Sequence, residues 1–308
     1  MPNYLLARLY SSLWVTFGVV SLVFFLIHWV PGDPVDVMLG ESFAATDREA
    51  LRHALGLDRP LLAQWGGFLA AVASGDLGQS LYNQEPVGSL LAQRFGATAE
   101  LTGAALMIAL LIALPAGIIA AARRGSAWDM GAMGFSLLGV SIPNFWLGPL
   151  LVLAFSLGLG WFPVSGRGEP LSLVLPAITL GTALAAVLSR MIRSSLLEIM
   201  SEDFIRTARA KGLSPYQVWV RHGLRNAWLP VLTVLGMQLG ALLGGAVITE
   251  TVFNWPGIGS LLVESIQRRD YPVVQGTVLM ISLCYVLINF ATDLLYARID
   301  PRIRLGQS

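Results

Sequence analysis

The stretch LTGAALMIALLIALPAGIIAAA, residues 101–122, decides the class of fold because it holds no charged side chain and a single hydroxyl. A helix of about 20 apolar residues is needed to cross the roughly 30 Å hydrocarbon layer of a bilayer, since every backbone amide must find its partner inside the helix there. Pro115 and Gly117 interrupt the run, but membrane helices tolerate both. We therefore expect this stretch to span a membrane.

The rest of the chain has the composition of a membrane protein. It is 55% hydrophobic and 13% charged, with a mean hydropathy of +0.66, whereas soluble domains carry about 25% charged residues. The net charge of +1 gives no basic surplus that would favour nucleic-acid binding. Cys284 is the only cysteine, so the chain has no internal disulfide and no thiolate metal cluster.

Six stretches are long and apolar enough to cross a bilayer, and they predict an all-α integral membrane protein with six transmembrane helices. The predicted spans are residues 9–30, 101–122, 133–159, 171–188, 230–249 and 273–295. A cleavable signal peptide competes for the first of them. The run exceeds the usual 7–15 apolar residues of such a peptide, and PGDP from Pro31 follows it instead of a small-residue cleavage site, so a retained helix is the better interpretation.

The basic residues predict the orientation, because cytoplasmic loops near span ends hold an excess of Lys and Arg. With the amino terminus inside, thirteen basic residues fall on the cytoplasmic side, seven of them between Ser189 and Trp228. The other seven fall outside, four of them in the first loop, which exceeds the roughly 60-residue limit of the rule. Both termini are therefore predicted to be cytoplasmic.

Two connections are too long to be simple turns. Residues 31–100 would form an extracytoplasmic cap between the first two spans, with helix-like stretches TDREALRHAL from Thr46 and EPVGSLLAQRF from Glu85. The domain organisation is then residues 1–30 as terminus and first span, 31–100 as the cap, and 101–308 as the core. A cytoplasmic loop, residues 189–228, belongs to that core.

This cytoplasmic loop has the pattern of two short helices that meet at a glycine. Residues 198–210 favour a helix, Gly212 breaks it, and Ser214 with Pro215 can cap and begin a second helix to about Leu224. Such a pair at the membrane surface can bind a soluble partner and transmit a movement of that partner to the spans on either side. The alternative is a basic surface loop that only satisfies the orientation rule.

The loop sequences EDFIRTARAKG from Glu202 and RHGLRNAWLPVLT from Arg221 resemble the signature loop of binding-protein-dependent ABC importer permeases, specifically the dipeptide and oligopeptide branch. Further motifs extend the resemblance over essentially the whole chain: WVPGDP at Trp29, GDLGQS at Gly75, SIPNFW at Ser141, NWPGIG at Asn254, RRDYPVVQG at Arg268 and DPRIR at Asp300.

The resemblance implies a permease subunit of an ATP-driven importer in the bacterial inner membrane. This subunit would form half of the translocation pathway for dipeptides or oligopeptides, together with a second permease, two ATP-binding subunits and an external substrate-binding protein. Importers of nickel chelates, glutathione and opines share much of the signature, so these substrates stay open.

The resemblance also implies that the cytoplasmic helix pair docks in a groove of the ATPase. The residues expected to carry this coupling are Asp203, Arg206, Thr207, Ala208, Ala210, Lys211 and Gly212. Gly212 would permit the sharp turn, and Ala208 and Ala210 the close approach to the ATPase. In the wider superfamily the loop reads Glu-Ala-Ala, then three residues, then glycine. Aligned on Gly212, this chain has Arg206, Thr207 and Ala208 at the first three positions, so the glutamate is absent.

The chain lacks the machinery for hydrolysing nucleotide. A phosphate-binding loop ends in GKS or GKT, whereas Lys211 follows alanine, so ATP would be bound by partner subunits and no catalytic, cofactor or metal site is expected here. An ion-coupled carrier is the rival class, but it needs carboxylates or histidines in mid-span, which are few. A purely structural scaffold is the third class.

Three neutral polar residues fall within predicted spans: Asn144, Gln238 and Asn289. Such groups either hold helices together by hydrogen bonds or face a water-filled path, and the sequence leaves both readings open.

Overall fold

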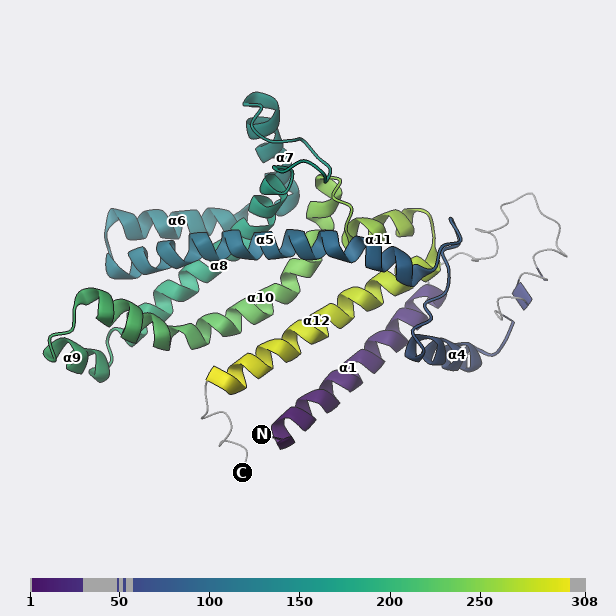
Figure 1. Cartoon of the computed structure of the whole chain (residues 1–308), viewed down its shortest axis with the longest axis horizontal. Helices are drawn as coiled ribbons and strands as arrows, with labels where there is room; N and C mark the ends of the chain where they lie inside the picture. The colour runs from purple at the N-terminus through teal and green to yellow at the C-terminus, as the bar shows by residue number, and fades with distance from the viewer. Residues whose placement is uncertain (1, 30–48, 50–51, 54–57, 300–308) are drawn as a thin grey trace. The chain divides into compact units, whose positions relative to one another are not determined.

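The computed structural model describes residues 2–29, 49, 52–53 and 58–299, and its regular elements are helices (Figure 1). In chain order they are α1 (Pro2–Trp29), α4 (Leu61–Ala73), α5 (Val87–Ala122), α6 (Ala127–Ser141), α7 (Asn144–Leu151), η1 (Val152–Gly158), α8 (Val174–Ile199), α9 (Asp203–Ala210), η2 (Gln217–Leu224), α10 (Arg225–Val252), α11 (Ile258–Gln267) and α12 (Tyr271–Ile299). The predicted all-α class is confirmed.

Four helices of the described residues are long and apolar enough to cross a membrane: α5, α8, η2 with α10, and α12. The bent pair of α6 and α7–η1 makes a fifth if it is a single span. The described apolar part of α1, Leu9–Phe25, is shorter, although the whole helix has 28 residues and is about 42 Å long. The structure thus supports four or five spans, and the count of six stays a prediction.

The third predicted span, residues 133–159, is not one straight helix. It breaks at Ile142 and Pro143, and the pair Ala127–Ser141 and Asn144–Gly158 is bent by 106°. The physical reason is local: Pro143 cannot donate a backbone hydrogen bond, and it forces Ile142 into an extended conformation with ψ of 115°.

The predicted boundaries around the long first loop also differ from the structure. The stretch from Glu85 is no separate cap helix, because it forms the first turns of α5, whose 36 residues extend over about 54 Å. Helix α4 was not predicted, since Gly66 and Gly67 in its middle disfavour a helix. The predicted helix from Thr46 falls mostly outside the described residues.

The chain divides into two compact units. Unit 1 contains residues 99–255 and 287–299, and α8 is its central helix. Helix α8 packs against α6, α7 and α10 and buries a continuous set of small and aliphatic side chains, among them Leu180, Ala185 and Leu188. At the carboxyl end of α8 the chain turns into α9, beyond the last turn of the span (Figure 1).

Unit 2 contains the described residues between 2 and 98, together with residues 256–286. Its core is a cluster in which Val87 and Leu91 of α5 meet Leu261 of α11 and Val273 of α12. Helix α4 packs against α1 in the same unit. A hydrogen bond in this unit connects residues that are 160 positions apart in the chain. The backbone N–H of Ile258 donates to Thr98 Oγ1 over 2.8 Å.

Candidate functional site

Helix α9 and the start of η2 form a small hairpin with its own core. Ile205 and Ala208 lie three residues apart and therefore share one face of α9. That face is buried against Val218, with Ile199, Met200 and Leu213 around it. Ile205 is fully buried and Ala208 is 5% exposed. The hairpin is therefore a packed unit and not a loose basic loop.

Gly212 produces the turn of this hairpin, as predicted. Its φ of +75° is in the left-handed region that L-residues avoid. The backbone N–H of Gly212 donates to the carbonyl of Arg209 over 3.0 Å, and that of Leu213 donates to the carbonyl of Ala208 over 3.4 Å. These two bonds make a Schellman motif, which ends α9 and returns the chain along it.

The opposite face of α9 is exposed to solvent, and most of the predicted coupling residues lie on it: Asp203, Arg206, Thr207, Ala210 and Lys211. Arg206 and Asp203 form an ion pair of 3.3 Å, but their side chains are 78% and 94% exposed. A pair so exposed contributes little to stability, so both groups are available to a partner.

Ala208 has a different place from the one expected. It was predicted to permit close approach of the ATPase, whereas the structure buries it inside the hairpin beside Ile205 and Val218. The reason is its register, because a residue three positions after Ile205 must lie on the same face of the helix. A larger side chain at position 208 would push α9 away from η2.

Two exposed aromatic side chains of the hairpin were not among the predicted site residues. Phe204 is 41% exposed and Tyr216 is 74% exposed. Exposed aromatic residues in a polar surface are the usual anchors of protein interfaces. A helical-wheel count from the buried Ile205 and Ala208 would have placed Phe204 on the outer face.

Short connections join the hairpin to the spans. The predicted loop, residues 189–228, is shorter than expected because α8 continues to Ile199 and covers its first eleven residues. On the other side η2 runs directly into α10, so Gln217–Val252 is one helix of 36 residues. Its first turns have π geometry, which is rare and frequent at functional sites. The hairpin is therefore continuous with α10 and lies directly after α8 in the chain.

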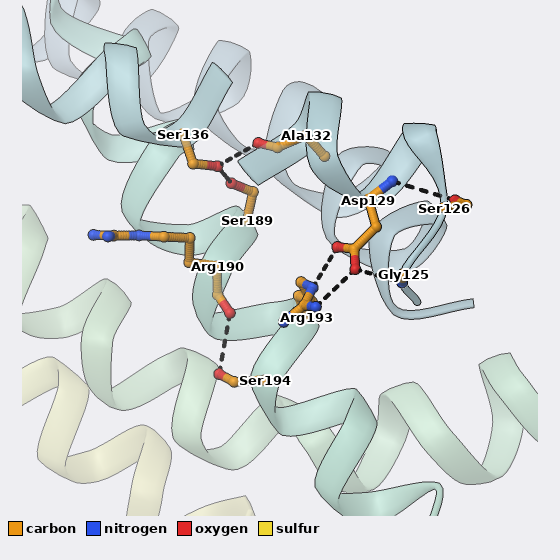
Figure 2. Close-up of polar contacts among 9 residues, drawn as sticks. All are labelled: Gly125, Ser126, Asp129, Ala132, Ser136, Ser189, Arg190, Arg193 and Ser194. Atoms are coloured by element: carbon orange, nitrogen blue, oxygen red, sulfur yellow. Dashed lines mark hydrogen bonds and ion pairs between the residues drawn. The ribbon is translucent and has the colours of Figure 1, made fainter. Parts of the chain in front are cut away.

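A buried ion pair attaches the end of α8 to α6 (Figure 2). Arg193 donates from Nε to Asp129 Oδ1 over 2.6 Å and from Nη2 to Oδ2 over 2.8 Å. The backbone N–H of Gly125 donates to the same Oδ2 over 2.9 Å. The side chains of Asp129 and Arg193 are 7% and 24% exposed. Bidentate geometry of this kind fixes the orientation of both helices as well as their distance.

Asp129 was not singled out from the sequence, although a local signal was present. It stands three residues after Ser126, which caps α6, and it lies in the first turn of that helix. The Ser-x-x-Asp spacing is a helix-start signature. Nothing local indicates its partner, because Arg193 is 64 residues further along the chain.

The same two helices approach closely further along, through small residues. The hydroxyls of Ser136 and Ser189 are 2.7 Å apart, and both residues are fully buried (Figure 2). One turn on, a Cβ added to Gly139 would lie only 2.9 Å from Ala186 Cβ. Small residues and buried hydroxyl pairs are typical of helix contacts within membranes. The α6–α8 contact thus holds α8, the helix that leads into the hairpin, against α6.

The three predicted pathway or helix-contact residues lie on different helices of unit 1. Asn144 begins α7, and its Nδ2 would lie 3.6 Å from a Cβ added to Gly245 of α10. Gln238 lies on α10 and Asn289 on α12. All three are half-buried. For Asn144 the contact with α10 favours the role of a helix contact, and the other two keep both readings.

Two sequence motifs of unit 2 are brought together by a buried carboxylate. Asp270 of RRDYPVVQG accepts a hydrogen bond from the Ser80 hydroxyl of GDLGQS and another from the Leu81 N–H over 3.1 Å. Ser80 Oγ in turn accepts the N–H groups of Tyr82 and Asn83, each over 3.2 Å. Ser80 and Asp270 are both 4% exposed. These motifs therefore have a structural role that connects residues 75–80 to the start of α12.

Removing this hydroxyl is expected to destabilise unit 2. Ser80→Ala removes the partner of the Tyr82 and Asn83 N–H groups and of an Asp270 carboxylate oxygen, and the carboxylate is buried, so its lost hydrogen bond costs about 1–3 kcal/mol. We expect a lower midpoint in thermal unfolding of the purified protein. Ser89→Ala, which removes an exposed hydroxyl bonded only to the Pro86 carbonyl, is the matched control and should leave the midpoint unchanged. Equal midpoints for both variants would contradict the structural role.

Among the described residues no group of three or more His, Cys, Asp or Glu side chains could hold a metal ion. The groups that this part of the chain brings together are ion pairs and hydrogen-bonded carboxylates, as at Asp129 and Asp270.

Comparison with known proteins agrees with the motif resemblance. Residues 113–305 match the family described as binding-protein-dependent transport system inner membrane component, and residues 1–102 match its amino-terminal region. The chain is 46% identical to the di/tripeptide transport system permease protein DppB of Pseudomonas aeruginosa, and 45% identical to the glutathione transport system permease protein GsiC of Escherichia coli. Each comparison covers 99% of both chains.

Solved structures show the same fold at lower identity. A chain of the MetNI methionine ABC transporter in an inward-facing conformation has a TM-score of 0.57 and 20% identity, over 68% of this chain and 96% of that one. A second crystal form of the same transporter has a TM-score of 0.58 and 22% identity, with the same coverage.

Proposed function

This chain belongs to the family of binding-protein-dependent transport system inner membrane components, and from that membership we propose that it forms half of the pathway of an ATP-driven importer of short peptides. The observation that carries the proposal is the full-length similarity to two permeases whose substrates, di/tripeptides and glutathione, are all short peptides. Nickel chelates and opines, whose importers share much of the signature, are the alternative substrates.

The partners follow from the same membership. A family of ABC importer permeases implies ATP-binding subunits and a substrate-binding protein, so this chain is a non-catalytic, multi-pass subunit of an inner membrane. We propose two ATP-binding subunits, a second similar permease, and termini on the cytoplasmic side. The distribution of basic residues supports this orientation, because it puts α9 and its neighbours inside.

In this arrangement the α9 hairpin is the contact for an ATP-binding subunit. Its exposed face presents Arg206 and Lys211 together with the aromatic ring of Phe204, while Ile205 and Ala208 hold the hairpin rigid. Rigid attachment at both ends, to α8 and through η2 to α10, allows closure of the ATP-binding subunits to move the spans.

Uptake measurements in reconstituted vesicles test the function. We expect a labelled dipeptide to enter only when the permeases, the ATP-binding subunits, the binding protein and ATP are all present. Unlabelled tripeptide and glutathione should compete for this uptake. Uptake that persists without ATP but is lost on adding an ionophore would instead support an ion-coupled carrier. Normal peptide uptake in a strain that lacks this chain would show that the chain is not needed for transport and would support a structural scaffold.

Truncating the exposed aromatics should weaken the docking of the ATP-binding subunits. We expect Phe204→Ala and Tyr216→Ala each to cost about 1–2 kcal/mol of binding, which is a fivefold to thirtyfold loss of affinity. Binding of the ATP-binding subunits to the detergent-solubilised permeases measures this. Val220→Ala, an exposed apolar change one turn beyond Tyr216, serves as the control. Unchanged affinity in both aromatic variants would remove them from the interface.

A further inference from the structure

Helix α4 has no surface that suits water. Its sequence, LLAQWGGFLAAVA, contains no charged residue and one polar side chain, Gln64, whose amide donates to the Arg59 carbonyl over 2.9 Å. None of its residues is buried, and Leu62 is 73% exposed. A helix with one face in water carries polar residues there, whereas an exposed helix that is apolar all round indicates a membrane environment.

The contacts of α4 with α1 show at what level of the bilayer it lies. The indole N–H of Trp65 donates to Ser21 Oγ over 3.2 Å, and its ring stacks on Phe25 with centroids 6.5 Å apart. Phe68 contacts Phe24 with a centroid distance of 5.6 Å. Helix α4 is thus attached along the outer half of α1, not beyond its end.

Ser21 lies eight residues before the end of α1 at Trp29, which is about 12 Å along the helix axis. Since the hydrocarbon layer is about 30 Å thick, a spanning α1 places Ser21 among the acyl chains of one leaflet. The Trp65–Ser21 hydrogen bond fits this level, because an indole N–H and a hydroxyl in hydrocarbon must each find a protein partner.

The length and the ends of α4 limit how it can lie. Its 13 residues extend over about 20 Å, too short to cross the bilayer. Polar residues flank it on both sides: Asp58 and Arg59 before, Ser74 and Asp76 after. Both ends therefore reach the headgroup layer on the same side, as in helices that lie in the interface plane.

We propose that α4 is embedded among the acyl chains of the outer leaflet beside α1, and that its exposed face, with Leu62, Ala63 and Ala70, is in contact with lipid. This part of residues 31–100 is then a membrane anchor of the predicted cap and no part of its water-exposed surface. The proposal rests on α1 spanning the bilayer, as in the proposed function, but on no property of the substrate or of the coupling to ATP.

Collision measurements on spin labels in the assembled transporter, reconstituted in lipid vesicles, test this placement. Nitroxide labels are attached in a Cys284→Ser background at Leu62→Cys and at Ala70→Cys, both on exposed positions, with Asp76→Cys just beyond the helix as the control. We expect molecular oxygen to collide with the labels at 62 and 70 several-fold more often than a water-soluble nickel chelate does. The order should reverse at 76.

Two results would overturn the proposal. Nickel-chelate collisions at 62 and 70 as frequent as those at 76 would place α4 in water. Low collision rates for both reagents would show that protein, from another subunit or a second copy, covers this face. If a label prevents assembly, Ala63→Cys on the same face replaces it. Peptide uptake by the same vesicles is scored separately, so failed transport with intact lipid contact would count against the proposed function alone.

Discussion

Replacing Arg193 by methionine is expected to lower the free energy of unfolding by about 3 kcal/mol, which is the low end for breaking a buried ion pair. The cost arises because Asp129, with its side chain 7% exposed, would keep its charge and lose both donors of the guanidinium. Only the N–H of Gly125 would still donate to its carboxylate. We take the low end because Arg193 itself retains 24% exposure.

Thermal unfolding of the purified permease, together with its yield in membranes, measures this effect. Arg190→Met is the matched control, since Arg190 lies on the same helix, is exposed and extends away from the pair (Figure 2). The double variant Asp129→Leu with Arg193→Met should regain most of the loss, because apolar replacements of a whole buried pair are often neutral. A single Arg193→Met variant as stable as the Arg190→Met control would show that the pair is dispensable.

Replacing Gly212 by valine is expected to abolish ATP-driven uptake while the protein still inserts into the membrane. A left-handed backbone costs an L-residue roughly 1–2 kcal/mol, and more for a β-branched one. A Cβ at this position meets nothing within 4 Å, so the expected damage comes from the backbone alone. The Schellman turn would open, and the core of Ile205, Ala208 and Val218 would lose its register.

Gly212→Asn provides the matched control, because asparagine enters the left-handed region far more readily than valine does. Uptake and binding of the ATP-binding subunits should both be near normal in the asparagine variant and lost in the valine variant. Normal uptake with Gly212→Val would refute the assignment of this hairpin to coupling. Loss in both variants would mean that a side chain as such, and not the backbone, disturbs the docking surface.

The features that the sequence predicted well are those set by short-range chemistry. The glycine turn at 212, the helical class and most of the apolar spans depend on residues within one or two helical turns of each other. The bend at Ile142 and Pro143 was missed because hydropathy does not register backbone geometry, although the proline was visible. Helix α4 was missed because Gly66 and Gly67 have a low helix propensity. In the structure the contacts of Trp65 and Phe68 with α1 outweigh that low propensity.

By itself the sequence determined that this chain is a helical membrane protein with a basic helix pair between two apolar spans, and that it resembles peptide importer permeases. Only the tertiary structure decided that Asp129 belongs with Arg193, that Ser80 belongs with Asp270, and that Ala208 faces inward. The reason is physical: hydropathy and turn chemistry are local, whereas these pairs depend on which helix faces meet across 64 and 190 residues of chain.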